Sequence, residues 1–147
     1  MSKIIKIGTC NSSANKIRDV ETIEVKCGKG IIGDRHYKTI NDERKQITII
    51  ESEKIDFYNS TSNTNFKYLD FRRNLVTRGL SLNKLLNKEF FIGSIKVKAC
   101  DYCKPCLHLQ KILKRNDIIK KFIDNGGLRC KILNDGSISV GDLVKND

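Results

Sequence analysis

The sequence has no Trp, one Pro and one Met among its 147 residues, and aromatic side chains make up only 7% of it. No run of 18 apolar residues occurs, so the sequence contains no candidate membrane-spanning helix. The segment Met1–Ile7 lacks the long apolar region and the small-residue cleavage site of a signal peptide, so we expect a cytoplasmic location. In a reducing compartment the six cysteines are expected to be core thiols, metal ligands or nucleophiles rather than disulfides.

Composition predicts one globular domain over residues 1–147, because 39% of the residues are hydrophobic and 31% are charged. The formal net charge is +11, from 28 Lys and Arg against 17 Asp and Glu, which favours an anionic ligand. The lysines are spread along the chain, as on an ordinary solvated surface. A nucleic-acid module is disfavoured, because single-strand binding needs aromatic side chains interleaved with basic ones and aromatics are scarce.

Short segments with apolar residues at every second position predict a mainly β fold. Ile5 and Ile7 alternate with lysine and glycine, and Ile23 and Val25 alternate with charged residues. Further strands are predicted at residues 45–50, 75–77, 89–92, 95–99, 130–133, 138–140 and 143–144. Asn134–Gly136 has the composition of a hairpin turn, and we expect it to join the strand before it to the last strands.

Helices are predicted to be few and short. They are expected at residues 51–58, as a single turn at 82–86, after Pro105, and from 116–117 to the glycines at 126–127, with a polar loop at 60–65. No regular strand-helix-strand alternation is visible, which argues against a parallel sheet. We therefore expect a small closed or nearly closed β-barrel with two or three short peripheral helices.

The densest group of chemically active side chains is the run Cys100-x-x-Cys103-x-x-Cys106-x-His108. Its spacing is typical of a Zn or Fe–S site, although Gln110 stands where a ferredoxin has its fourth cysteine. The shell would have to be completed by His108, Cys10, Cys27 or Cys130. The alternative is that Cys100 and Cys103 are small apolar residues at the end of a strand.

Cys106 differs from its neighbours because it follows Pro105. If Pro105 is the first residue of a helix, Cys106 lies in the first turn, where backbone N–H groups and the helix dipole stabilise a thiolate. Lys104 acts in the same direction. Such a thiolate is a nucleophile, a sulfur carrier or a soft-metal ligand, and the alternative is a buried structural cysteine.

Two further segments have the composition of anion sites. Residues Gly33, Asp34, Arg35 and His36 follow a predicted strand, where backbone N–H groups and a guanidinium can hold a phosphate or a carboxylate. The second segment comprises Arg72, Arg73 and Asn74. Alternatively, the first is a tight turn with its own salt bridge and the second is solvated.

The order of these segments is more specific than any one of them. Seven motifs in order together resemble the MOSC domain, named for the C-terminal domain of molybdenum cofactor sulfurase. They are Gly30-x-x-Gly-Asp-Arg-His36, Gln46–Ile50, Phe71-Arg-Arg-Asn-Leu-Val-Thr-Arg-Gly79, Ile92-Gly93, Pro105-Cys106, Gly126-Gly-Leu128 and Gly136-x-Ile-x-Val-Gly-Asp142. The resemblance extends from about Gly8 to Val144 and is to the short, stand-alone members.

The resemblance implies a β-barrel with one functional cysteine, which falls on Cys106 and carries sulfur or ligates molybdenum. It also implies that Arg35 with His36, and Arg72 with Asn74, hold the phosphate and pterin of an anionic molybdenum cofactor. Cys100 and Cys103 lie outside the family pattern. The pyridoxal-phosphate desulfurase domain of larger relatives is absent from this sequence, so we expect a partner, a cysteine desulfurase or an electron-donor protein, to supply sulfur or electrons.

Overall fold

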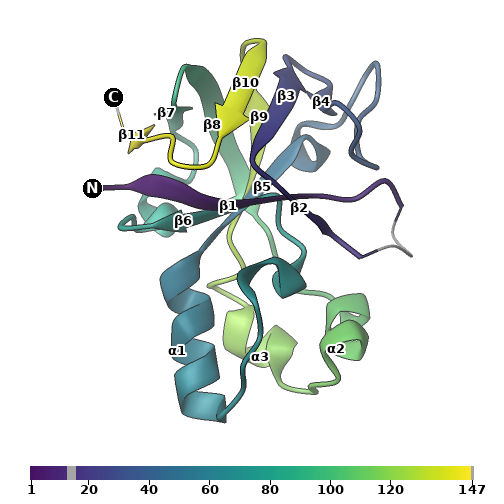
Figure 1. The fold of residues 1–147 in the computed structure, drawn as a ribbon, viewed down its shortest axis with the longest axis vertical. Coiled ribbons are helices and arrows are strands. Elements are labelled where there is room, and N and C mark those ends of the chain that lie inside the picture. Colours follow the sequence, from purple (N-terminus) through teal and green to yellow (C-terminus); the bar gives the residue numbers. More distant parts are fainter. Residues whose placement is uncertain (13–15, 147) are drawn as a thin grey trace.

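The computed structural model describes residues 1–12 and 16–146 (Figure 1). The strands are β1 Lys3–Thr9, β2 Arg18–Val20, β3 Thr22–Lys26, β4 Gly30–Ile31, β5 Ile47–Glu51, β6 Leu75–Arg78, β7 Glu89–Ile92, β8 Ile95–Tyr102, β9 Leu128–Ile132, β10 Gly136–Ser139 and β11 Val144–Lys145. The α-helices are α1 Ser52–Ser62, α2 Leu107–Leu113 and α3 Ile118–Phe122. Short 3₁₀ turns cover η1 Glu43–Lys45, η2 Tyr68–Phe71 and η3 Leu82–Leu85.

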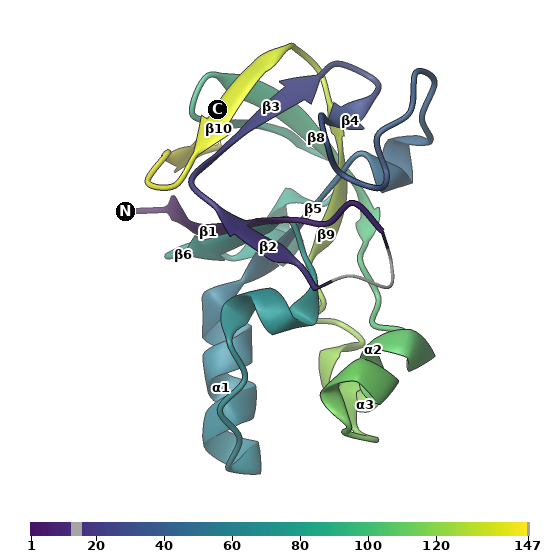
Figure 2. The same ribbon diagram turned by 45° about the vertical axis from the view of Figure 1, so that its right-hand side comes forward.

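The strands form a curled sheet of eight, in the order β11-β7-β8-β9-β5-β6-β1-β2, and a second sheet in the order β10-β3-β4. The segment before β11 closes the large sheet against β1, because Ile4 N–H donates to Asp142 O and Val144 N–H donates to Ser2 O. The predicted closed or nearly closed β-barrel with peripheral helices is therefore confirmed. Figure 2 shows the barrel wall curling around its interior.

Pairing within the sheets is antiparallel except at one place. β5 and β6 run parallel and are joined through α1, which packs on both strands. The strands predicted at residues 89–92 and 95–99 are present as β7 and β8, which form a hairpin around Gly93 with Ile92 opposite Ile95. The hairpin predicted at Asn134–Gly136 is wrong, because β9 pairs with β5 and β8, whereas β10 crosses to the second sheet and pairs with β3.

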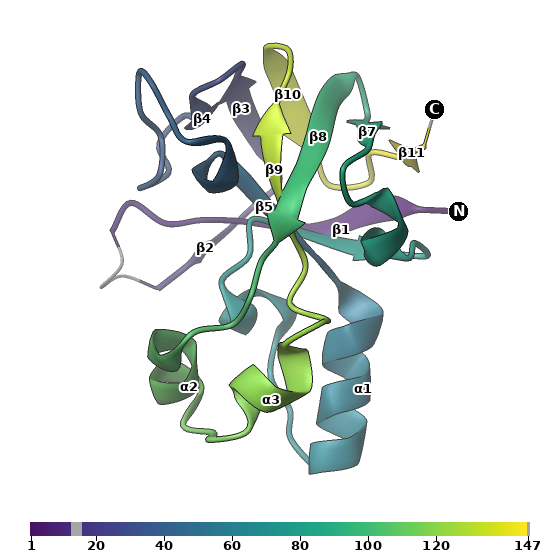
Figure 3. The same ribbon diagram turned by 180° about the vertical axis from the view of Figure 1, so that it is seen from behind.

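Two apolar cores follow from the alternating pattern. One fills the barrel with inward-facing side chains such as Ile4, Ile49 and Phe90. The other lies between the outside of the sheet and the helices, where Phe71 packs against Tyr58 and Phe122. This second core fixes the helices to one end of the barrel (Figures 1 and 3).

The α1 helix is longer than predicted. It continues to Ser62 through residues expected to form a polar loop and ends at Asn63, whose left-handed backbone (φ 55°) stops it. The hydroxyl of Thr61 donates to the carbonyl of Phe57, one turn back, so this polar residue is accommodated within the helix. None of the helices within the described ranges is long and apolar enough to cross a bilayer.

Candidate functional site

Two segments far apart in sequence meet at Cys10, the residue directly after β1. The backbone N–H of Cys10 donates to Asp34 Oδ1 (3.0 Å), and its carbonyl accepts from the N–H of Arg35 (2.7 Å). Arg72 places its Nη2 3.6 Å from Cys10 Sγ. The structure thus brings together two of the groups predicted to bind an anion, and it does so through a residue to which the sequence assigned no such role.

The loop after β4 is a tight turn held by its own carboxylate. Gly33 has φ 88°, a left-handed conformation that favours glycine, and no atom lies within 4 Å of where a Cβ would be. Asp34 is buried, and its Oδ2 accepts from the N–H of His36 (3.2 Å). Because Asp34 holds the loop, the half-buried side chains of Arg35 and His36 are the parts that can face a ligand.

Positive charge surrounds His36. Burial is the largest cause that lowers the pKa of His36, followed by the charge of Arg35; Asp34 opposes the shift, and Lys45 and Arg129 add to it. A cluster of cations that lowers the pKa of a histidine is electrostatically suited to an anion.

Arg129 is the member of this cluster that sequence reasoning missed. It lies opposite Thr48 in the ladder between β5 and β9, on the outer face of the barrel. Its Nε is buried and has no hydrogen-bond partner within residues 1–12 and 16–146. A buried donor without a partner is costly in a folded protein, so Arg129 Nε is suited to donate to a bound anion. In the sequence, Arg129 is a basic residue between two apolar ones. That pattern predicts a strand but does not indicate a ligand site.

Arg73 is built into the scaffold. It is buried, and its guanidinium donates to the backbone carbonyls of Gly126 (2.9 Å), Cys103 (3.0 Å) and Phe71 (3.1 Å). The loop that follows β8 is therefore anchored by a fork of N–H donors that ties together three separate parts of the chain.

The side chain of Asn74 also forms hydrogen bonds within the protein. Its Oδ1 accepts from the backbone N–H and the hydroxyl of Thr48, and its Nδ2 donates to Gly8 O (3.1 Å). These bonds join β1, β5 and β6 at one end of the sheet. The role in cofactor binding predicted for Arg73 and Asn74 stays a prediction, but the contacts made by both side chains position neighbouring segments.

Cys106 is the exposed thiol of the cysteine run. It is the N-cap of α2, with an extended backbone (φ −125°, ψ 170°), so the prediction that Pro105 begins the helix and Cys106 lies in its first turn is wrong: the helix begins two residues later, at Leu107. The reason lies upstream, where the N–H of Cys103 donates to Gly127 O and the chain packs against Gly126. The helix starts only after this anchored segment. Lys104 is exposed beside Cys106.

Cys100, Cys103 and Cys130 are less exposed than Cys106, whereas Cys27 is exposed. Cys103 and Cys130 are buried, and Cys100 is half-buried in β8. Burial raises the pKa of the Cys130 thiol, with smaller contributions from Cys100 and Cys103, and burial also raises the pKa of Cys100. The raised pKa values favour the neutral form of the Cys100 and Cys130 thiols, which is a poor nucleophile. Across the part of the chain that the structure describes, no group of three or more His, Cys, Asp or Glu side chains is arranged to hold a metal ion.

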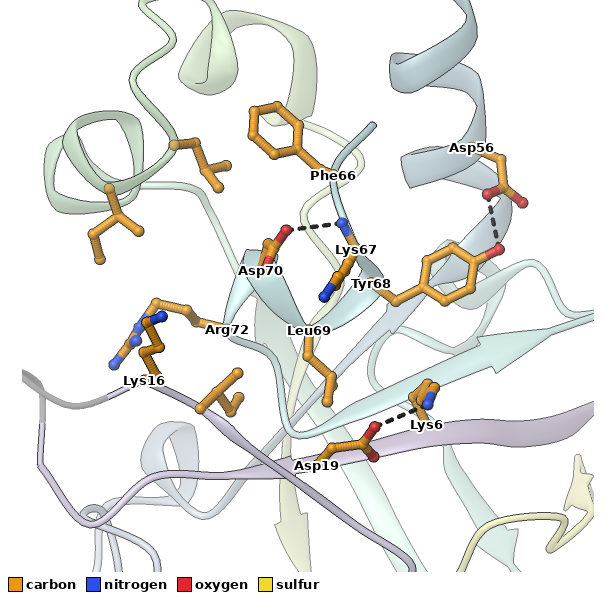
Figure 4. A pocket seen from close by; sticks show the side chains of 13 residues that line it. Lys6, Lys16, Asp19, Asp56, Phe66, Lys67, Tyr68, Leu69, Asp70 and Arg72 are labelled. Atoms are coloured by element: carbon orange, nitrogen blue, oxygen red, sulfur yellow. Dashed lines mark hydrogen bonds and ion pairs between the residues drawn. The ribbon is translucent and has the colours of Figure 1, made fainter. Parts of the chain in front are cut away.

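Arg72 also lines a cavity of about 980 Å³, together with residues of β1, β2, η2 and α2 (Figure 4). The backbone of Arg72 is left-handed (φ 62°), an uncommon conformation for a residue with a side chain.

The end of β1 and the start of β2 lie between the loop that follows β4 and helix α2 (Figures 1 and 2). Loops that carry several of the predicted site residues are thus gathered on one side of the molecule.

This arrangement agrees with a match to a known family. The sequence profile of the MOSC domain matches residues 33–145, and the chain therefore belongs to the MOSC domain family. No curated protein sequence matches it.

Solved structures support the same fold. The crystal structure of YuaD protein from Bacillus subtilis is similar with a TM-score of 0.84 and 14% identity, over 98% of this chain and 94% of that one. YiiM from Geobacillus stearothermophilus has a TM-score of 0.78 and 18% identity, over 99% and 74%. YiiM from Escherichia coli has a TM-score of 0.71 and 16% identity, over 99% and 69%.

Proposed function

We propose that this MOSC domain protein carries sulfur on Cys106. The observation that supports this most directly is the contrast among the cysteines of the run: Cys106 is exposed at the end of an anchored loop, whereas Cys103 is buried and Cys100 is held neutral by burial. Arg73 and Gly126 fix the start of that loop. A thiol that is exposed on a rigid support can meet a donor without unfolding of the domain.

The proposed step is transfer of a sulfane sulfur. The Cys106 thiolate attacks the outer sulfur of a persulfide on the donor, a new S–S bond forms at Cys106, and the S–S bond of the donor breaks. The donor leaves as a thiolate, and Cys106 carries the terminal sulfur and its proton. No external oxidant or reductant is needed, because the sulfur moves between two thiols without a net change in oxidation state.

A second candidate function is binding of the molybdenum cofactor. The specific observation that favours it is the buried Nε of Arg129, which has no hydrogen-bond partner among the residues that the structure describes. Arg35, Lys45 and Arg129 around His36 form a cationic cluster that fits the phosphate of such a cofactor, with Arg72 close by across Cys10. In this reading Cys106 would be the protein ligand to molybdenum, and the cofactor would supply redox or sulfido chemistry at the metal. The chain's own residues would bind the phosphate and orient the ring.

Sulfur has to arrive from a partner, and the surface around Cys106 indicates its chemistry. Residues 104–121 carry six Lys and Arg but only one acidic residue, Asp117. Asp117 accepts a hydrogen bond from the hydroxyl of Tyr58 (2.6 Å) and forms an ion pair with Arg115. The five lysines form no ion pair within 4 Å in the described ranges. This surface suits an acidic face on a cysteine desulfurase or an electron-donor protein.

Mass spectrometry after incubation with a cysteine desulfurase and cysteine tests the sulfur-carrier function. The wild-type protein should gain the mass of one sulfur, and the gain should disappear on reduction. Cys106→Ser should gain none, whereas Cys27→Ser, which removes the other exposed thiol, should gain as much as the wild type. No transfer to the wild type, or equal transfer to Cys106→Ser, contradicts the proposal.

The alternative of a Zn or Fe–S site at Cys100, Cys103 and Cys106 makes a different prediction. Such a site would bring one metal ion or cluster per chain through purification without chelators, and its removal would unfold a structural site. Elemental analysis together with circular dichroism before and after chelation separates the two readings. Stoichiometric metal that is lost with the fold would favour the metal site over the sulfur carrier.

A further inference from the structure

A second potential binding site lies in the cavity of about 980 Å³ beneath the β1–β2 ribbon (Figure 4). Its walls come from β1, β2, η2, α1 and α2 and from the segments that precede β2 and η2. Among the described residues that line the cavity, Arg72 alone belongs to the predicted site, whereas the turn after β4, Asn74 and Cys106 lie outside it. Its volume lies in the range of small-molecule sites, about 300–1,000 Å³.

One part of the cavity wall is apolar and partly aromatic. Phe66 lines the cavity, is half-buried, and stacks on Tyr58 behind it, with ring centroids 6.2 Å apart. Ile17, Leu69 and Leu113 supply aliphatic surface from three other segments. A flat or aliphatic ligand body would be desolvated on this wall, at a gain of about 25 cal/mol per Å² of apolar surface buried.

Each acidic residue that lines the cavity forms an ion pair or a hydrogen bond within the protein. Asp19 pairs with Lys6 (2.9 Å), as Figure 4 shows. Asp56 accepts from a tyrosine hydroxyl (2.8 Å), and Asp70 accepts from the backbone N–H that precedes η2 (2.8 Å). Each of the three carboxylates therefore has a hydrogen-bond partner within the protein, and the charge of Asp19 is paired with that of Lys6.

Two lysines of the cavity differ from its acidic residues in their contacts. Lys16 and Lys67 line the cavity, both side chains are exposed, and neither forms an ion pair within 4 Å across residues 1–12 and 16–146. Figure 4 shows Lys16 beside the Arg72 end of the cavity and Lys67 above Leu69. Cations above an apolar wall are complementary to a ligand with one anionic group and an apolar body.

We infer that this cavity binds a small organic anion with an aromatic or apolar body, such as an aromatic sulfonate, carboxylate or phosphate ester. The apolar wall holds the body, and Lys16 and Lys67 hold the anionic group. This site does not depend on the thiol chemistry of Cys106. Removal of Cys106 should leave binding unchanged, so failure of the sulfur-carrier proposal and failure of this inference are distinguishable.

A pair of fluorescent probes tests the inference. Anilinonaphthalene sulfonate and N-phenyl-1-naphthylamine share their ring system and differ in the sulfonate group. We expect the sulfonate to bind at one saturable site at least about threefold more tightly than the neutral probe, and Lys16→Glu and Lys67→Glu each to weaken it by about threefold to tenfold. Lys84→Glu, an exposed change on η3 outside the cavity, should leave the affinity unchanged.

Amide chemical shifts locate the probe without relying on the variants. The inference predicts that addition of the sulfonate perturbs Phe66, Leu69 and Leu113 more than the barrel interior. Equal affinity for the two probes would overturn it, as would Lys16→Glu and Lys67→Glu proteins that stay folded by circular dichroism and bind like the wild type. Shifts centred on the groove beside Lys111 and Lys114 instead of the cavity would also overturn it.

Discussion

Replacement of Arg73 by Met removes the fork that anchors the loop before Cys106. The side chain is buried and donates to three backbone carbonyls at 2.9–3.1 Å. Met keeps much of the volume and all of the apolar contact but donates nothing. The Arg73→Met variant therefore isolates the contribution of the hydrogen bonds from that of packing.

The loss of stability in Arg73→Met follows from the number of hydrogen bonds that the guanidinium forms. A hydrogen bond to a charged group contributes about 1.5–3 kcal/mol, and three such bonds that share one side chain are not fully additive. We expect a loss of about 3–5 kcal/mol in the free energy of unfolding, a large part of the roughly 5–15 kcal/mol typical of a domain. For a chain of this length, that loss lowers the melting temperature by roughly 10 °C.

Thermal and urea unfolding measured by circular dichroism check this prediction. Arg78→Met is the matched control, because Arg78 is exposed and its hydrogen bond to the hydroxyl of Tyr68 (3.2 Å) lies at the surface. We expect it to cost less than about 1 kcal/mol. A similarly small cost for Arg73→Met would refute the structural role that we assign to Arg73 and would favour a side chain that serves a ligand.

Three further predictions concern pH, packing and thiol reactivity. The pKa of His36 is lowered in the folded protein, so the unfolded state binds a proton first on acidification; stability should fall as pH decreases below about 6.5, and His36→Asn should reduce this slope in urea titrations. A Cβ at Gly126 would collide with the carbonyl of Cys103, so Gly126→Ala should cost about 1–3 kcal/mol in unfolding free energy. Iodoacetamide should label the two exposed cysteines in the native protein but Cys130 only after denaturation, as peptide mapping would show; early labelling of Cys130 would contradict its burial.

The positions of most strands could be predicted from the sequence because period-two alternation depends on local residues alone. Which strands pair with one another could not be predicted from the sequence. Asn134 and Asp135 have the composition of a hairpin turn, yet Asn134 Oδ1 accepts from the N–H of Lys96 and Asp135 Oδ1 accepts from the N–H of Cys27. These bonds tie the turn to two other segments, and the strand that follows joins a different sheet. A turn motif predicts a reversal of the chain and does not identify the next partner.

The candidate site shows the same limit. The motif order predicted the family, and the segments around Arg35 and Arg72 do converge. The sequence could not distinguish Arg72, which reaches the cavity, from its neighbour Arg73, which faces backbone carbonyls. That distinction depends on distant residues. Arg129 was missed for the same reason, since only the fold places it near His36.

The most direct test of the central claim is the mass of the protein after sulfur transfer from a cysteine desulfurase. Our account predicts a reducible gain of one sulfur that maps to the peptide containing Cys106, persists in Cys27→Ser and is absent from Cys106→Ser. A gain that maps to another cysteine, or no gain in the wild type, would contradict it.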